Sequence, residues 1–276
     1  MLINNDQQLR ELIPNVFASV KGETSLFEKL FPFIAFAERW VIGDFSSQDV
    51  FNIIAAEPDD NITKFTAKRI IVCEALRNAV PSLDIVLTPN GFGVVSNTNI
   101  ATASKDRVER LVASLASQRD DLIEAFIPML AEFPLWIGSA QYCFFSATLF
   151  PNINLASLCG FKSDRWEKFL ELRQLAIDIE ASLAEDFFSP ELMSQLRTYA
   201  IKGNVPECAV SLLRGIRAQV INVLRGKPIS IRRMIDLVNY IRNSPDDFSA
   251  WHNSATAKLF SPPKFYNKKD SKGYWF

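Results

Sequence analysis

The sequence predicts a mainly α-helical protein of two packed helical units, with a β-hairpin inserted in the first. Apolar residues recur at helical spacing along almost all of the 276 residues. The stretch 83–111 departs from that spacing, because two short β-like runs in it flank a Pro-Asn-Gly turn. Short patterns from the first half also return in the second half in the same order, which points toward two related units.

The predicted division places the first unit at residues 1–132, with its hairpin at 83–96, and the second unit at 133–276, with an aromatic tail. A chain of this length suits either two domains of ordinary size or one large integrated domain, and both arrangements stay open. The apolar content of 48% is typical of a globular protein.

Helix start signals organise the first unit. Ser25 and Glu28 form a capping box, in which the serine oxygen accepts a free amide and the glutamate reaches back to the serine N–H. The box opens a helix with apolar residues spaced over 26–41. A short helix is expected at 48–55, and a helix that is apolar nearly all round, hence centrally buried, at 63–80.

The hairpin prediction depends on the runs "LDIVL" and "FGVVS" and on the "TPNG" between them. Gly91 suits that turn because glycine adopts a positive φ without steric cost. Ser104 then caps a further helix, for which a break is expected near Gln118.

No charged residue occurs in 133–161. Pro134 and Pro151 bracket fewer residues than the ~20 that a membrane span needs, so we expect a central buried helix joining the two halves. Cap residues and apolar spacing then predict helices that begin near Asp164, Ser189, Val205, Ile229 and Ser244.

Three pairs of stretches form the internal echo. "LFEKLFPF" resembles "RWEKFLEL", with Glu28 aligned to Glu167. "GDFSSQDV" resembles "EDFFSPEL", and "QRDDLIEAF" resembles "NSPDDFSAW". Short helical matches also arise by chance, so a duplication and a coincidence both stay open. In a duplication, the hairpin would be an insertion in the first copy.

The residues provide no recognisable catalytic or cofactor motif. His252 is the only histidine, which excludes a two-histidine metal site, and no nucleophile motif accompanies it. The "GFG" at 91–93 lies inside the expected hairpin and does not join a strand to a helix, so it is no dinucleotide fingerprint. No C-x-x-C motif is present either. We therefore expect no enzyme activity, no cofactor and no metal.

The charges are distributed unevenly. Residues 1–61 carry ten acidic and four basic side chains, whereas 190–243 carry nine basic and three acidic ones. Three interpretations remain open: solvated helix faces, a DNA-facing surface, and head-to-tail packing of copies. Net charge is −1 and no nucleic-acid motif occurs, so we rank head-to-tail packing above DNA contact. The candidate basic surface comprises Arg214, Arg217, Arg225, Arg232 and Arg233.

Two segments are candidate protein interfaces. One is the hairpin tip, and the other is the aromatic tail, whose residues either pack back onto the protein or add a strand to a partner. The candidate interface residues are Pro89, Asn90, Gly91, Phe92, Phe265, Tyr266, Tyr274, Trp275 and Phe276.

The stretches "LFPFIAFAERWVIGDF", "LTPNGFGVVSNTNIATASKDRVERL" and "FYNKKDSKGYWF" resemble an uncharacterised family of proteins from Bacteroidetes prophages and related mobile elements. That family shares a glycine-containing hairpin followed by an Ala-Ser-Lys helix start, here Ala103, Ser104 and Lys105. The first half is also loosely similar to all-helical head–tail connector proteins of tailed phages. The resemblance implies no catalytic residues.

The function expected from these observations is a phage or prophage structural protein, most simply a head–tail connector or neck component that acts by protein–protein assembly. Its partners would be further copies of itself, packed head to tail, and other virion proteins such as portal or tail components. The alternative is a DNA-binding accessory protein that uses the basic region 190–243. The polar start and the absence of a membrane segment predict a cytoplasmic protein during assembly, and a virion component afterwards.

Overall fold

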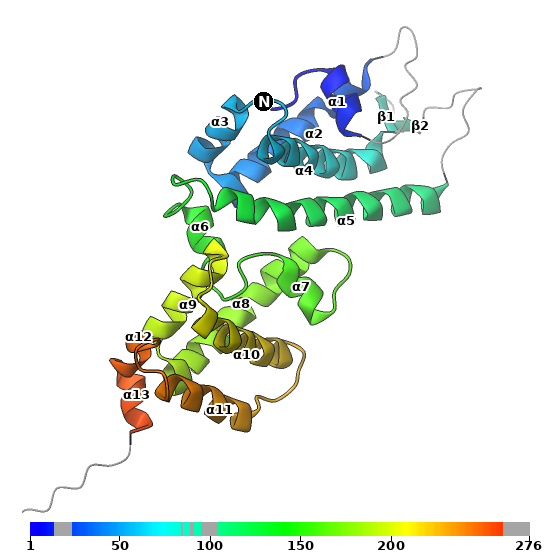
Figure 1. Cartoon of the computed structure of the whole chain (residues 1–276). Helices are drawn as coiled ribbons and strands as arrows, with labels where there is room; N and C mark the ends of the chain where they lie inside the picture. Colours follow the sequence, from blue (N-terminus) through cyan, green and yellow to red (C-terminus); the bar gives the residue numbers. More distant parts are fainter. Residues whose placement is uncertain (14–23, 84, 89–90, 95–103, 262–276) are drawn as a thin grey trace, which may run out of the picture.

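The computed structural model describes residues 1–13, 24–83, 85–88, 91–94 and 104–261, and it confirms a mainly helical protein (Figure 1). Two groups of helices lie at opposite ends of the molecule, with one long helix of the first group facing the second group (Figure 1). We name the two groups the first unit (residues 1–146) and the second unit (residues 147–261).

The elements of the first unit are α1 (Asp6–Leu12), α2 (Leu26–Val41), the π-helical turn η1 (Ile42–Ser46), α3 (Gln48–Ala56), α4 (Ile62–Ala79), the 3-10 turn η2 (Val80–Ser82), strands β1 (Ile85–Thr88) and β2 (Gly91–Val94), α5 (Lys105–Leu130) and α6 (Ala140–Phe145). Those of the second unit are α7 (Asn154–Cys159), α8 (Arg165–Leu183), the π-helical turn η3 (Ala184–Phe188), α9 (Pro190–Lys202), α10 (Glu207–Leu224), α11 (Ile231–Arg242), α12 (Ser249–His252) and α13 (Ala255–Leu259).

Local capping explains several helix starts. The Ser25 hydroxyl accepts the N–H of Glu28 at 3.2 Å, and the Ser189 hydroxyl accepts the N–H of Leu192 at 3.3 Å. Helix α4 packs between α2 and α5 and is largely buried, as its nearly all-round apolar sequence predicts. Its packing makes α4 the centre of the first unit.

The strands β1 and β2 follow α4 and precede α5 along the chain. They pair antiparallel, with Ile85 opposite Val94 and Thr88 opposite Gly91. They fall within the 83–96 range expected for the hairpin. The residues at its expected tip, Pro89 and Asn90, lie outside the described residues.

Two expectations about helices are wrong. Helix α5 continues through Gln118 without a break. The uncharged segment 133–161 does not form one central buried helix, because it contains two short helices, α6 and α7, with irregular chain between them. Because helix α6 packs on η1, the first unit as we name it includes α6 and ends at 146, and the predicted boundary at 132 stays a prediction. Among the described helices, none combines the length and apolarity that crossing a membrane requires.

A buried glutamate lies near the end of a helix in each unit. Glu38 on α2 accepts the backbone N–H of Leu2 at 2.7 Å. Glu180 on α8 accepts the backbone N–H of Leu149 at 2.8 Å. In both units the glutamate therefore holds the chain segment that begins the unit.

A π-helical turn follows directly in each unit, η1 after α2 and η3 after α8. Each turn is followed by a serine with positive φ, Ser47 at 68° and Ser189 at 65°. The two serines are separated by the same number of residues as the two glutamates, Glu38 and Glu180. A non-glycine residue in this region is strained, so its occurrence at the same place in both units is informative.

A tryptophan closes each π-helical turn. The indole N–H of Trp136 donates to the carbonyl of Phe45 at 2.7 Å, and that of Trp251 donates to the carbonyl of Phe187 at 2.8 Å. A serine shortly after each tryptophan caps a short helix, α6 in the first unit and α13 in the second. Fewer residues separate Trp136 from Trp251 than separate Glu38 from Glu180. The difference arises because the first unit has extra residues between α4 and α5, where the strands lie.

Candidate assembly site at the junction of the units

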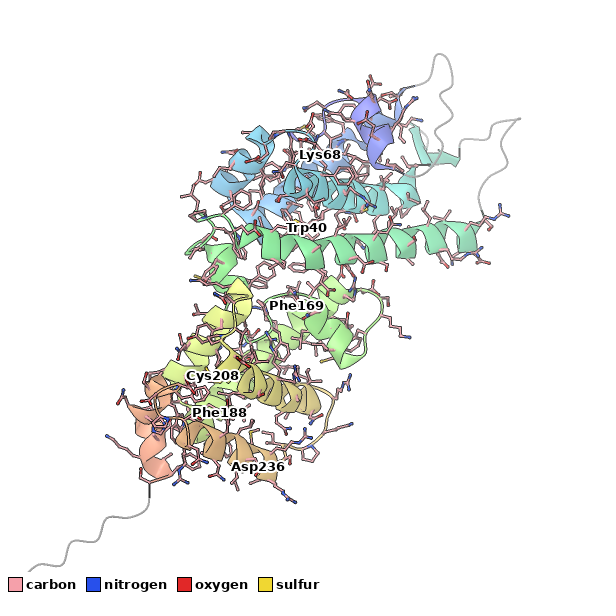
Figure 2. The ribbon with its side chains drawn as sticks, viewed as in Figure 1. Trp40, Lys68, Phe169, Phe188, Cys208 and Asp236 are labelled. Carbon is pink, nitrogen blue, oxygen red and sulfur yellow. The ribbon has the colours of Figure 1, made fainter. Side chains whose placement is uncertain are left out.

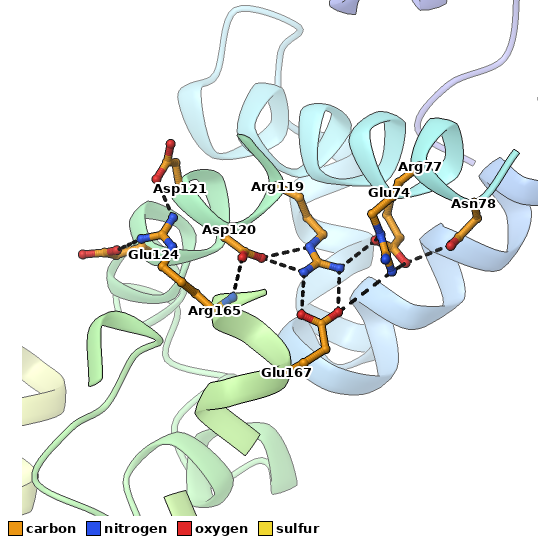
Figure 3. A network of polar contacts seen from close by, with 9 residues as sticks. All are labelled: Glu74, Arg77, Asn78, Arg119, Asp120, Asp121, Glu124, Arg165 and Glu167. Carbon is orange, nitrogen blue, oxygen red and sulfur yellow. Dashed lines mark hydrogen bonds and ion pairs between the residues drawn. The ribbon is translucent and has the colours of Figure 1, made fainter. Parts of the chain in front are cut away.

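The junction is the surface where α5, α6 and η1 of the first unit meet α8 of the second. At its centre lies Arg119, whose side chain is 1% exposed. Its guanidinium donates to Glu74 on α4 at 3.0 Å, to Asp120 on α5 at 2.7 Å and to Glu167 on α8 at 3.0 Å (Figure 3). One side chain therefore joins three helices from both units.

The charges in this network stabilise one another. Burial disfavours the charged form of Arg119, but hydrogen bonding and the nearby carboxylates raise its pKa above the ordinary value. Burial likewise opposes ionisation of Glu74, yet the guanidinium groups of Arg77 and Arg119 hold its pKa below the usual range. The same balance lowers the pKa of Glu167. A charge buried this deeply is tolerated only because it is paired and hydrogen-bonded.

Asp120 extends the network to the start of α8. Its carboxylate accepts the backbone N–H of Arg165 at 2.8 Å. Asp164, the N-cap residue of α8, makes no side-chain capping bond, so an aspartate of the first unit caps a helix of the second. The guanidinium of Arg165 in turn pairs with Asp121 and, at 2.9 Å, with Glu124 (Figure 3).

An aromatic cluster completes the junction beside these charges. The ring of Trp166 lies 4.7 Å from that of Phe45 and 6.1 Å from that of Trp40. Phe145 stacks on Phe169 at 6.1 Å. Figure 2 labels Trp40 in the first unit and Phe169 in the second. These contacts span the two units, and aromatic pairs contribute about 0.5–1.5 kcal/mol beyond the area they bury.

Arg173 on α8 closes one edge of the cluster. Its guanidinium carbon lies 3.8 Å from the ring centre of Phe144, and its Nε donates to the Phe144 carbonyl at 3.0 Å. Beside it is an open recess of about 290 Å³, where the only ionisable group among its lining residues is Asp44. Burial raises the pKa of that carboxyl.

The candidate interface residues of the hairpin and tail are not tested by these contacts. Gly91 and Phe92 belong to β2, whereas Pro89 and Asn90 are outside the described residues. So are the five aromatic residues of the tail, Phe265, Tyr266, Tyr274, Trp275 and Phe276. The roles of the hairpin tip and the tail as protein interfaces stay predictions.

Two of the five arginines of the candidate basic surface bind backbone carbonyls of the same chain. Arg217 donates to the Leu149 carbonyl at 2.8 Å through Nε, and Arg225 donates to the Leu158 carbonyl. These two arginines hold backbone within the second unit. The side chain of Arg225 is exposed all the same, as are those of Arg214, Arg232 and Arg233.

Sequence reasoning missed the junction entirely. The only available signal was that Glu74 follows the apolar run 70–73, and that Arg119 and Asp120 lie in the polar run near Gln118. The partners are far apart in the sequence, so no local pattern pairs them. His252, the sole histidine, contacts the Ile241 carbonyl through its ring nitrogen at 3.0 Å. Among the side chains that the structure describes, no group of three or more His, Cys, Asp or Glu could hold a metal ion.

A model of a protein family of unknown function (DUF6712) matches residues 19–146. The matched segment ends where the first unit ends, so the chain is similar to this family over the first unit. No curated protein and no solved structure matches the chain.

Proposed function

We propose that this protein is a structural component of a phage or prophage particle, a head–tail connector or neck protein that acts by protein–protein assembly and contains two copies of one helical unit. The observation that carries the assembly role is the junction, where α5, α6 and η1 of the first unit hold α8 of the second through a buried arginine network and an aromatic cluster. The attribution to phage particles is supported by the resemblance of the stretches at 30–45, 87–111 and 265–276.

Features repeated at one constant spacing support the duplication. The buried glutamates, the π-helical turns and the serines with positive φ all recur with the same sequence offset. The pair "GDFSSQDV" and "EDFFSPEL" shares this offset, whereas the pair "LFEKLFPF" and "RWEKFLEL" is displaced from it by about one helical turn. Accidental similarity of short helices does not reproduce strained residues and hydrogen bonds at matching places. The family match to the first unit alone fits a second copy that has diverged.

The hairpin is then an insertion specific to the first copy. Strands β1 and β2 lie between α4 and α5, and the corresponding connection in the second unit, between α10 and α11, has no strand among its described residues. We assign the hairpin and the aromatic tail as docking elements for other virion proteins, such as portal or tail components. The protein would assemble in the cytoplasm and remain in the virion.

The DNA-binding alternative loses part of its basis. Two of the five candidate arginines, Arg217 and Arg225, donate to backbone carbonyls of the same chain and are engaged in folding. The region 190–243 still exposes further basic side chains, namely Lys202, Arg214, Lys227, Arg232, Arg233 and Arg242, so the alternative is weakened only at those two positions. Binding of the full chain to duplex DNA at two salt concentrations separates the two functions, and we expect no steep salt-dependent affinity.

The direct test is the protein content of particles released after induction of an element that encodes the chain. We expect mass spectrometry of gradient-purified particles to find the protein in a fixed ratio to the portal protein. Its absence from particles that contain portal and tail proteins would overturn the structural role.

A further inference from the structure

We propose that Ile231, Ile235 and Leu259 form a docking surface for the first unit of a second copy, so that the contact between copies repeats the junction inside each chain. We name these three residues the outer surface. The inference rests on the proposed duplication and the proposed assembly function, and it specifies the contact through which copies associate.

The outer surface corresponds in position to the first unit's side of the junction. When the units are aligned on their two tryptophans, Ile231 on α11 matches Ala116 on α5, and Ile235 matches Asp120. Ala116 is 6% exposed and Asp120 is fully buried, because α8 lies against that side of α5. Ile231 and Ile235 are instead 57% and 47% exposed.

The short helix after each tryptophan shows the same difference in exposure between the two units. Leu259 on α13 aligns with Phe144 on α6, which is half-buried under Arg173. Leu259 is 73% exposed. Positions that are covered in the first unit are thus apolar and uncovered in the second, as far as the described residues show. We infer from this difference that these positions of the second unit are covered by another chain.

The occupant is identified by what covers the equivalent surface inside the chain. That cover is α8, and its counterpart is α2 when the units are aligned on their buried glutamates. Phe169 and Arg173 on α8 then align with Phe27 and Phe31 on α2, whose rings lie 6.0 Å apart. Phe31 is 46% exposed, so it can cover the leucine of α13 in another copy as Arg173 covers the phenylalanine of α6. A threonine stands in place of Trp166, so this contact relies on the two phenylalanines.

The two surfaces lie toward opposite ends of the molecule. Helices α11 and α13 lie at the end far from α2, and Asp236, the residue after Ile235, is labelled at that end (Figures 1 and 2). A contact between different surfaces is heterologous, and it produces rings where the rotation closes and filaments where it does not. Arg232 and Arg233, next to Ile231 on α11, are exposed, and Glu28 is exposed in the first turn of α2, so charges of opposite sign are present on the two surfaces.

The test compares self-association of full-length variants by sedimentation equilibrium. We expect Leu259→Asp on the outer surface and Phe31→Asp on α2 each to lower the association constant at least tenfold. Leu175→Asp is the matched control, because Leu175 is also exposed, at 54%, on the solvent face of α8. It should leave association unchanged. Circular dichroism confirms that each variant is folded.

Cross-linking distinguishes a heterologous contact from a symmetric one. A mixture of the Phe31→Cys and Leu259→Cys variants should form disulfide-linked dimers above the background of the native cysteines, and neither variant should do so alone. Dimers formed by Leu259→Cys alone would overturn the head-to-tail geometry.

The possible failures are separable. If the chain self-associates but neither aspartate variant weakens it, the outer surface is not the contact, and the assembly function stands. If the chain does not self-associate at any concentration, the inference fails, and presence in particles decides the function independently.

Discussion

Glu38 and Glu180 occupy the same place in the two units. Each is buried in the last turn of a helix that leads into a π-helical turn, and each accepts a backbone N–H from the segment that begins its unit. A carboxylate in this place fixes the start of the unit against its central helices. The correspondence supports the proposed duplication, since it concerns a hydrogen bond and not only sequence similarity.

The two tryptophans should be energetically equivalent if the units are copies. Trp136→Phe and Trp251→Phe each leave a π-turn carbonyl without its indole donor, at 2.7 and 2.8 Å in the native protein. We expect each change to lower the free energy of unfolding by about 1–3 kcal/mol. Urea denaturation measures both. A loss confined to one variant would contradict the equivalence.

Replacing Ser47 by glycine should stabilise the protein. Ser47 has φ of 68° and ψ of 160°, a conformation that only glycine adopts without strain, and its side chain makes no capping hydrogen bond. We expect Ser47→Gly to raise the free energy of unfolding by about 1 kcal/mol, after the entropic cost of glycine. Ser47→Ala is the control, because alanine keeps the strain. A gain in the alanine variant equal to that in the glycine variant would exclude backbone strain as the cause.

Removing the guanidinium of Arg119 at the centre of the junction should destabilise the protein strongly. In Arg119→Leu, the buried carboxylate of Asp120 loses its cation, and that of Glu74 keeps only Arg77. We expect a loss of about 3–5 kcal/mol in the free energy of unfolding. Arg110→Leu is the matched control on the exposed face of α5, where a change within about 0.5 kcal/mol is expected. Equal effects in thermal or urea unfolding would contradict the role assigned to Arg119.

Glu180 should make stability depend on pH. Burial raises the pKa of its carboxyl from 4.5 to about 6, although the N–H of Leu149 and the guanidinium of Arg197 oppose the shift. A folded-state pKa above the unfolded value means that the folded protein binds the proton more tightly. The resulting stabilisation is complete below about pH 4.5 and is lost as pH rises through 6.

Since one pKa unit corresponds to about 1.4 kcal/mol, this contribution is about 2 kcal/mol. Other carboxylates also titrate, so the informative quantity is the difference in unfolding free energy between the wild type and Glu180→Gln. We expect that difference to change by about 2 kcal/mol between about pH 4.5 and 7.5. A difference independent of pH would show that Glu180 does not titrate as assigned.

The sequence predicts most helix starts because capping is local. Ser25 and Ser189 each act on an amide less than one helical turn ahead, which a single stretch of sequence contains. The expected break near Gln118 failed for the opposite reason. The polar run there is not a loop, because Arg119 and Asp120 are buried in the junction by residues of α4 and α8.

The uncharged segment was misjudged for a similar reason. Leu149 lies in irregular chain, yet its N–H donates to Glu180 and its carbonyl accepts from Arg217. Side chains of α8 and α10 thus satisfy backbone groups that a helix would otherwise satisfy internally. The candidate site could not be predicted from the sequence either, because it consists of contacts between the two units and not of a local pattern.

The mass of the purified protein, measured by light scattering behind a sizing column at several concentrations and two salt levels, tests the central claim of head-to-tail assembly most directly. We expect a discrete oligomer that grows more populated with concentration, weakens with added salt, and weakens further in the Arg232→Glu/Arg233→Glu variant. A monomer under all conditions, or an oligomer indifferent to both salt and charge reversal, would contradict it.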